Sequence, residues 1–464
     1  MKRLLFLMFA TLSISTIAYA QSDEYIVKFN CEPPTEITQK LTKSELKDNI
    51  YLTENPEMLD GYDDIIDYIE PNERALPIDS VISPFPMQKA TLAQESTNPD
   101  FSYYNLINMK FPHTFMTFGN NVNVAVIDSG CSNHLCLSGN IAGGYNYITN
   151  EETFDDDKNH GTFVSSIIAG EANRTEFLGI APKVNIYALK CFSEDFSPDS
   201  ILLAKAVTDA VDKYNCKVIN MSFVISTPNQ TLHNAIKHAV NDKGAIVVAS
   251  VGNNYDDTVF YPAGYEEVIG VGSVERNGLR SAFSQYNDTV YVTAPGGSVY
   301  GFIGENSLAY GDGTSFAAPF VSGAAAIMLS ADSTMTPDEF KFLLKNTAYD
   351  INEDGWDREL GHGILDVKAM FNELIKDIPY YLSPVNTDGI YILNNSQYPL
   401  SAIGILIYQD DCGNFSAESS DIALGIGEST TVEAFDTQSQ NFYLWDSLAS
   451  LKPLAIHRSE TNIK

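Results

Sequence analysis

Residues 311–323 read Gly311-Asp312-Gly313-Thr314-Ser315-Phe316-Ala317-Ala318-Pro319-Phe320-Val321-Ser322-Gly323, and this stretch decides the fold. Small and apolar residues continue to Leu329, which predicts a buried helix with Ser315 at its start. The first amides of a helix lack intrahelical partners and the helix dipole is positive there, so the position suits a nucleophile beside a developing oxyanion. Pro319 lies in the first turn, where a missing amide costs least. A serine at a helix start is commonly a plain N-cap, so this stretch alone leaves both interpretations open.

Length and charge limit the classes of protein that the chain can belong to. At 464 residues we expect two to four domains, and 44% hydrophobic residues support a large core. The formal net charge of -32 argues against nucleic acid or an anionic membrane as a partner, because such binding needs clustered Lys and Arg. Solubility is the simplest meaning of this charge.

The first 20 residues have the pattern of a secretory signal peptide. Lys2-Arg3 is followed by an apolar run and then by Ala18-Tyr19-Ala20, a small-x-small cleavage pattern. An uncleaved membrane anchor is the alternative, but the uncharged run is short and contains polar residues. We therefore predict cleavage after Ala20, a secreted product and no membrane span in the mature chain.

The six cysteines are too sparse for a disulfide framework. Only Cys131 and Cys136 lie close enough in the sequence to suggest a bridge. His134 lies between them. It and His160, which opens the run of small residues at 160–170, are the two candidates for a histidine of the functional site. A Cys-x-x-His-x-Cys metal site is a further alternative there, although its spacing is not a usual zinc pattern and no fourth ligand is evident.

The region before residue 98 has the pattern of a small α+β unit followed by a linker. Residues 24–29 alternate like a strand, residues 40–49 favour a helix, and residues 63–72 favour a second strand that ends at a proline. Residues 74–98 are rich in Pro, Ser and Thr without a clear period, as expected of a linker or processing region.

From about residue 100, apolar strands alternate with helices. The predicted strands are residues 122–127, 184–189, 218–222 and 245–249. These near-continuous apolar runs indicate a parallel sheet covered by helices on both faces, a doubly wound α/β domain. The predicted helices are residues 200–213, 231–242, the run after Ser315, and 337–347. Past about residue 375, short strands at 389–393, 403–408, 430–434 and 441–445 predict a small all-β domain.

Four polar residues are predicted at strand ends or helix starts of this α/β domain. Asp128 follows the first strand, His160 opens a run of small residues, and Asn253 follows the fourth strand. Each has an ordinary structural explanation when taken singly: a turn, a cap or an Asn turn. Together with Ser315 they form a nucleophile, a base, an orienting carboxylate and an oxyanion donor in the order Asp, His, Ser.

On these residues the chain resembles the subtilisin-like serine peptidases, or subtilases, over roughly residues 100–367. The motifs that carry the resemblance are Val126-Ile127-Asp128-Ser129-Gly130, His160-Gly161-Thr162, Gly252-Asn253 and Gly313-Thr314-Ser315-Phe316-Ala317-Ala318-Pro319. The resemblance implies that Ser315 is the nucleophile, His160 the general base and then acid, and Asp128 the group that orients the imidazole. It also implies an oxyanion hole formed by Asn253 and the Ser315 amide.

The resemblance extends upstream and sets the expected domains. Tyr25-Ile26-Val27-Lys28-Phe29 and Tyr68-Ile69-Glu70-Pro71-Asn72 are similar to the first and last strands of the family's inhibitory propeptide. We therefore expect a signal peptide at 1–20, a propeptide and processing region at 21–97, a peptidase domain at 98–375 and a β-rich domain at 376–464. Processing is expected between residues 72 and 98.

Several substrate-binding residues follow from the same resemblance. They are Ser222, Phe223, Val224, Ser250, Gly252 and Phe260. Val224 stands where the family has glycine in a strand that pairs with substrate, and this predicts hindered pairing. Phe260 is expected to shorten the first specificity pocket and to favour small or medium residues, with simple core packing as the alternative. Phe316 replaces a family methionine beside the nucleophile, which predicts tolerance of peroxide.

No cofactor is expected for the chemistry, and a structural calcium ion is disfavoured. Cys136 replaces an Asp that binds calcium in many relatives, and only Asn173 survives from the second part of that site. Residues 350–355 contain Asp350, Asn352, Asp354 and Gly355 but lack the closing Glu of a calcium loop. An acidic solvated turn is the favoured interpretation.

The sequence thus predicts a secreted serine endopeptidase that acts through an acyl-enzyme and is made as a self-processing zymogen. Its partners would be polypeptide substrates and its own propeptide. One alternative is a surface binding protein that uses the protease fold as an inert scaffold. Another is a peptidase dedicated to processing one partner propeptide.

Overall fold

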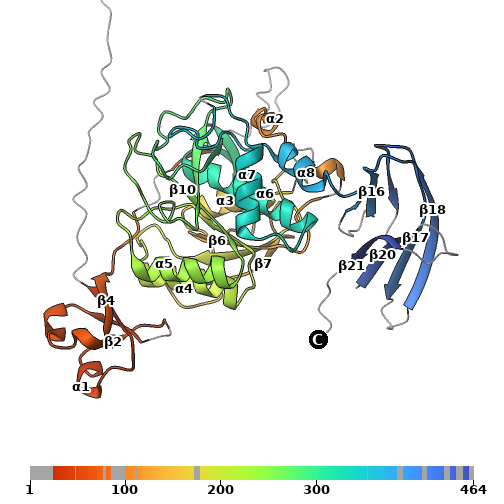
Figure 1. The fold of residues 1–464 in the computed structure, drawn as a ribbon. Helices are drawn as coiled ribbons and strands as arrows, with labels where there is room; N and C mark the ends of the chain where they lie inside the picture. The colour runs from red at the N-terminus through yellow and green to blue at the C-terminus, as the bar shows by residue number, and fades with distance from the viewer. Residues whose placement is uncertain are drawn as a thin grey trace, which may run out of the picture. The chain divides into compact units, whose positions relative to one another are not determined.

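The computed structural model describes residues 24–458, apart from 47–48, 77–79, 85–100, 110–111, 116, 172–177, 353, 384–389, 410–414, 433–438 and 446–452. The predicted signal peptide and Cys412 therefore lie outside the described residues. The chain divides after Glu73 into two compact units (Figure 1).

The first unit is a four-stranded antiparallel sheet with the order β2-β3-β1-β4. Its elements are β1 (Tyr25–Phe29), α1 (Thr35–Thr38), β2 (Thr42–Lys43), β3 (Ile50–Thr53) and β4 (Ile66–Pro71). Val27, Phe29 and Tyr51 lie in its core. The predicted strands at 24–29 and 63–72 are present, although the second begins only at Ile66.

The helix predicted at residues 40–49 is wrong. Strand β2 lies there and pairs with β3. The hydroxyl of Ser44 accepts a hydrogen bond from the Leu46 amide at 3.0 Å, a local turn that competes with helical bonding. Pairing with β3 outweighs the weak helical propensity of this segment.

The second unit is built on a seven-stranded parallel sheet with the order β12-β11-β10-β9-β6-β8-β7. The strands are β6 (Asn123–Asp128), β7 (Ile141–Asn146), β8 (Asn185–Lys190), β9 (Val218–Met221), β10 (Ile246–Ser250), β11 (Ile269–Val274) and β12 (Val292–Pro295). The four predicted strands form β6, β8, β9 and β10. The sequence analysis missed β7 and β11, which contain glycines that interrupt their apolar runs, and the short β12.

Helices flank this sheet, which confirms the doubly wound α/β fold. They are α3 (His160–Ala169), α4 (Ser200–Asp212), α5 (Gln230–Lys237), α6 (Thr314–Ala331), α7 (Pro337–Thr347) and α8 (Val367–Ile375), with a π-helical turn at His238–Asp242. Helix α6 packs along β9, β10, β11 and β12 and against α3, whereas α4 and α5 lie side by side (Figure 1).

Helix α6 is the central apolar element of the core. Among the described residues it is the one helix long and apolar enough to cross a membrane, yet 89% of it is buried inside the protein. Such burial is typical of the core helix of a large α/β domain. Thr314 and Ser315 open this helix, so packing against the sheet fixes the position of Ser315.

A small antiparallel sheet with the order β13-β14-β5 precedes α6. Its strands are β13 (Val299–Ile303), β14 (Ser307–Asp312) and β5 (Val81–Pro84). Strand β5 lies within residues 74–98, which the sequence analysis treats as a linker without regular structure. That prediction is wrong for residues 81–84, because their strand becomes visible only through its pairing with β14, more than 200 residues later in the chain.

The C-terminal part consists of two sheets with the orders β15-β16-β19 and β18-β17-β20-β21. The strands are β15 (Tyr380–Leu382), β16 (Ile390–Asn394), β17 (Leu400–Gln409), β18 (Phe415–Leu424), β19 (Ser429–Val432), β20 (Ser439–Trp445) and β21 (Pro453–Arg458). Their residues form a hydrophobic cluster of their own around Ile390, Ile392 and Leu444. Strands β15, β18 and β21 were not predicted from the sequence, and β17 extends beyond the predicted residues 403–408 at both ends.

Candidate active site

Asp128 ends strand β6 and is fully buried. The Ser129 amide donates to its Oδ1 at 2.7 Å. Gly130 then turns the chain with a φ of 108°, and a Cβ there would come within 2.3 Å of the Phe154 carbonyl oxygen. The glycine is thus required by both conformation and space, and it directs the chain away from the sheet immediately after the carboxylate.

His160 is the first residue of α3, and its imidazole is hydrogen-bonded to Asp128. The ring Nδ1 lies 2.8 Å and 3.0 Å from the two carboxylate oxygens. A Cβ on Gly161 would come within 2.1 Å of the Gly130 carbonyl oxygen, so a glycine at this position lets the helix start approach the end of β6. The structure therefore brings these two predicted residues together from 32 positions apart.

Ser315 lies at the start of α6 with 5% of its surface exposed. Its hydroxyl donates to the Ser222 carbonyl at 3.0 Å, and the Ser222 hydroxyl donates to the Ser315 carbonyl at 2.7 Å. The His160 ring centroid is 5.4 Å from that of Phe316, the next residue in the helix. The imidazole thus lies beside the first turn of α6, and its buried Nε2 has no hydrogen-bond partner among the described residues.

Asn253 lies beside the same helix start. Its side-chain oxygen accepts hydrogen bonds of 2.8 Å from both the amide and the hydroxyl of Thr314. Because the oxygen faces Thr314, the NH₂ group points the other way. The Thr314 hydroxyl also accepts from the Gly252 amide at 3.2 Å. Thr314 was not predicted as a site residue, although its place directly before Ser315 is a signal that could have found it.

Asp156 is a second carboxylate beside the Asp128–His160 pair, half-buried, and it was not predicted from the sequence. It accepts hydrogen bonds from the Ser129 hydroxyl at 2.7 Å and from the Thr162 amide at 2.7 Å. Burial raises its pKa. The Ser129 hydroxyl also lies 3.2 Å from Asp128, so Asp156 supports the turn that carries the Asp128–His160 pair. Its signal in the sequence is an Asp placed four residues before His160.

The predicted substrate-binding residues lie around this site. Ser222, Ser250 and Phe223 are buried, and Phe223 packs against Phe192 with ring centroids 5.3 Å apart. A Cβ on Gly252 would lie 2.7 Å from the Phe260 ring, and Phe260 is itself buried. Phe260 is therefore close to the loop that carries Asn253, and its role in specificity stays a prediction.

Residues 74–76 pair with two segments of the same unit. The Leu76 amide donates to the Val224 carbonyl at 2.9 Å, and the Ala75 amide donates to the Pro198 carbonyl at 2.8 Å. The backbones of Arg74 and Asp199 form an isolated antiparallel β-bridge. The valine side chain at 224 therefore does not prevent strand pairing with the chain's own residues.

The cysteine bridge suggested by the sequence is absent. Cys131 and Cys136 are free and buried, and burial raises the pKa of Cys131 to about 12. His134 accepts a hydrogen bond from the Cys136 amide at 3.1 Å, and its ring stacks on Phe302. The described residues contain no group of three or more His, Cys, Asp or Glu side chains that could hold a metal ion.

The two segments considered for calcium provide no further evidence for it. Asn173 lies outside the described residues. In the acidic turn, the Asp350 carboxylate accepts a hydrogen bond from the Gly355 amide at 2.7 Å, and the interpretation as a solvated turn stays a prediction.

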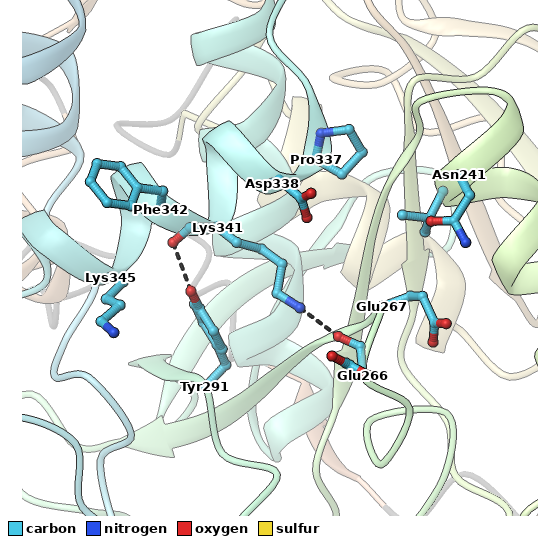
Figure 2. A pocket seen from close by; sticks show the side chains of 10 residues that line it. Asn241, Glu266, Glu267, Tyr291, Pro337, Asp338, Lys341, Phe342 and Lys345 are labelled. Carbon is cyan, nitrogen blue, oxygen red and sulfur yellow. Dashed lines mark hydrogen bonds between the residues drawn. The ribbon is translucent and has the colours of Figure 1, made fainter.

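A separate surface hollow of about 480 Å³ lies between α7 and the loops before β11 and β12 (Figure 2). Lys341 donates to the Glu266 carbonyl across it at 2.6 Å, and Tyr291 donates to the Lys341 carbonyl at 2.8 Å. None of the predicted site residues lines this hollow.

Comparison with known proteins identifies the family. The model of the subtilase family matches residues 119–363. A thermostable alkaline protease of Halalkalibacterium halodurans is 34% identical over 244 residues, which are 53% of this chain and 66% of that protease. Subtilisin DY of Bacillus licheniformis is 34% identical over 256 residues, which are 54% of this chain and 91% of subtilisin DY.

A solved protease structure from Pseudoalteromonas arctica agrees with these relatives. It is 27% identical, has a TM-score of 0.53, and is matched over 60% of this chain and 100% of its own. Since the family model covers more than half of the chain, the chain belongs to the subtilase family. Its fold is that of the subtilisin-like serine peptidases, and the match spans less than two thirds of the length of several of these relatives.

Proposed function

We propose that this protein is a secreted serine endopeptidase, made as a self-processing zymogen, with Asp128, His160 and Ser315 as its catalytic triad. The observation that carries the proposal is the buried Asp128–His160 hydrogen bond, with the imidazole beside the helix start that holds Ser315. The signal-like first 20 residues support secretion.

The chemistry follows from the hydrogen bonds of the imidazole. Because Nδ1 donates to Asp128, the lone pair of the neutral ring is on Nε2. Nε2 takes the proton of Ser315 as the hydroxyl oxygen bonds to the carbonyl carbon of the substrate. For this step the hydroxyl turns away from the Ser222 carbonyl, which accepts its hydrogen bond in the resting chain.

The carbonyl oxygen of the substrate then carries negative charge. The Ser315 amide and the Asn253 NH₂ group are the donors for it, and Thr314 holds the Asn253 amide in the orientation this requires. The imidazolium gives its proton to the leaving amine and the C–N bond breaks, leaving an acyl ester on Ser315. A water molecule, deprotonated by the same imidazole, hydrolyses the ester and restores the serine hydroxyl.

The backbone pairing of residues 74–76 and of residues 81–84 supports self-processing. Residues 74–76 pair beside Val224, and residues 81–84 pair with β14, which ends three residues before Ser315. These two paired segments flank residues 77–80 in the sequence. We expect the first cut between Leu76 and Ser80, within the wider interval of residues 72–98 that the sequence analysis gives.

The test compares the full chain with Ser315→Ala and Asn253→Ala. We expect the unaltered chain to cut itself and to hydrolyse peptides, and Ser315→Ala to remain uncut. In subtilisin, from which we take the magnitudes, loss of the nucleophile lowers turnover about 10⁶-fold and loss of the Asn donor about 10²- to 10³-fold. Equal losses for the two variants, measured with one peptide substrate, would contradict the assigned roles.

The same experiment separates the alternatives. An inert scaffold would leave the unaltered chain and Ser315→Ala equally uncut and inactive. A peptidase dedicated to one partner propeptide would cut its own chain but fail on a peptide library. Within an active enzyme, the library also tests Phe260, since a preference for large aromatic residues before the cut bond would refute the short pocket.

A further inference from the structure

Strand β5 follows residues 74–76 in the chain and pairs with β14, which ends three residues before Ser315. It therefore lies after the bond that the proposed first cut breaks. Its four residues pair antiparallel with β14, from Val81 opposite Asp312 to Pro84 opposite Ala309. Ser80 lies next to Gly313, since a Cβ on that glycine would come within 2.6 Å of the Ser80 hydroxyl. The strand therefore leads directly away from the first turn of α6.

Two contacts hold β5 in place besides the strand pairing. The side chain of Ile82 packs against the main hydrophobic core, whereas Val81 is 62% exposed. A Cβ on Gly311 would lie 2.9 Å from the Val81 carbonyl oxygen and 2.6 Å from the Phe316 ring. The glycine in β14 thus permits both the close approach of β5 and the packing of the residue after Ser315.

We propose that residues 81–84 remain on β14 after the first cut and occupy the binding edge for the chain that follows the scissile bond. This proposal rests on the proposed function. It goes further in assigning an inhibitory role to a segment that the cut itself does not release. An added strand of this kind gains affinity from main-chain hydrogen bonds and register from its alternate side chains. Here the apolar side chain of Ile82 supplies the register.

After the first cut, the two segments that bind substrate then differ in accessibility. Once residues 74–76 and the unit before them leave, the segment around Val224 can bind substrate residues that precede the cut bond. The β14 edge stays covered until residues 81–84 are removed or displaced. Long polypeptides must displace β5, whereas a short substrate without residues after the scissile bond need not.

The test measures two substrates on one sample of once-cut enzyme. One is a tetrapeptide anilide, which ends at the scissile bond. The other is an internally quenched peptide with the same four residues followed by six more. We measure the ratio of the quenched-peptide rate to the anilide rate, and mass spectrometry confirms that residues 81–84 are still attached.

Ile82→Lys should raise this ratio about tenfold, because placing a charge against the core weakens strand pairing by about that factor. Val81→Lys is the matched control and should leave the ratio unchanged, since the Val81 side chain is exposed. Equal ratios for the unaltered chain and Ile82→Lys would overturn the proposal. Absence of anilide hydrolysis in all samples would instead overturn the proposed function, and this inference with it.

A second arm does not depend on the folding of the Ile82 variant. In enzyme from which residues 81–84 have been trimmed, a synthetic peptide of residues 79–86 should inhibit hydrolysis of the quenched peptide without changing anilide hydrolysis. Inhibition of both substrates to the same extent, or of neither, would show that the peptide does not bind β14 as proposed.

Discussion

Two buried histidines of the peptidase unit, His160 and His134, have opposite hydrogen bonds. His160 presents its Nδ1 to the Asp128 carboxylate, which accepts, whereas the Nδ1 of His134 accepts from the Cys136 amide. In each ring Nε2 is buried without a hydrogen-bond partner among the described residues. A neutral His160 therefore has a lone pair on Nε2, and a neutral His134 has a proton there.

In the proposed function, this difference distinguishes His160, the proposed base, from His134. In the proposed mechanism, the Asp128 carboxylate would stabilise the imidazolium that forms during the reaction. His134 has only the ring of Phe302 against its face, and burial lowers its pKa to about 4. Burial without an acidic partner thus disfavours the protonated imidazole, whereas a carboxylate partner favours it.

The largest expected effect separates the two rings directly. His160→Ala should lower kcat for peptide hydrolysis by about 10⁶-fold, the magnitude known for loss of the base in subtilisin. His134→Ala should leave kcat within about threefold at neutral pH, since it lies outside the triad. Steady-state kinetics on an anilide substrate measures both, and a comparable loss for the two variants would show that the comparison is wrong.

The next effect converts His160 into a ring like His134. Asp128→Asn retains the shape of the side chain but can donate to Nδ1, which would place the ring proton on Nε2. We expect kcat to fall by about 10⁴-fold, as for the corresponding change in a trypsin-like triad. A loss below about tenfold, in a variant with an unchanged circular dichroism spectrum, would mean that Asp128 does not set the tautomer.

This contrast also shows what the sequence could and could not predict. Asp128, His160 and Ser315 are detectable because glycines and small residues surround them, and the structure shows why Gly130 and Gly161 are required there. Thr314 and Asp156 act through hydrogen bonds to residues far apart in the chain. Their positions shortly before Ser315 and His160 indicate a role, but they do not specify which partners these side chains bond.

The remaining errors have the same origin. The spacing of Cys131 and Cys136 suggests a bridge, but whether two thiols bond depends on geometry that spacing does not specify. Strand β5 was missed because its partner β14 lies far along the chain. Local periodicity therefore predicted four strands of the parallel sheet (β6, β8, β9 and β10) and missed the pairing of β5 with β14.

A third prediction concerns the aromatic neighbour of His160. Phe316 lies against both His160 and Phe163, and it offers no sulfur beside the nucleophile. We expect activity to survive mild peroxide, and Phe316→Met to be inactivated at least about tenfold faster. The Cys131→Ala variant controls for thiol oxidation. Rapid loss of activity in both the unaltered chain and the Cys131 variant would contradict the prediction.

The smallest effect is a pH dependence of stability that arises at His134. Its pKa in the folded chain is about 4, below the 6.5 of an exposed histidine, because burial disfavours the charged ring. Between these values the unfolded chain binds a proton that the folded chain does not. Stability is therefore lost as the pH falls from about 6.5 towards 4, by on the order of 3 kcal/mol.

His134→Phe should remove this loss while preserving an aromatic ring against Phe302. We would measure urea unfolding at pH 7 and pH 4.5 in the Ser315→Ala background, which prevents self-digestion, and compare the change in midpoint between variants. His238→Gln is the control of opposite sign, because hydrogen bonds to Asp242 and Asp212 raise the pKa of that exposed ring. If the His134→Phe variant loses as much stability between pH 7 and pH 4.5 as the protein with His134 does, the buried imidazole is not the acid-sensitive group. The contrast between the two histidines would then hold for catalysis alone.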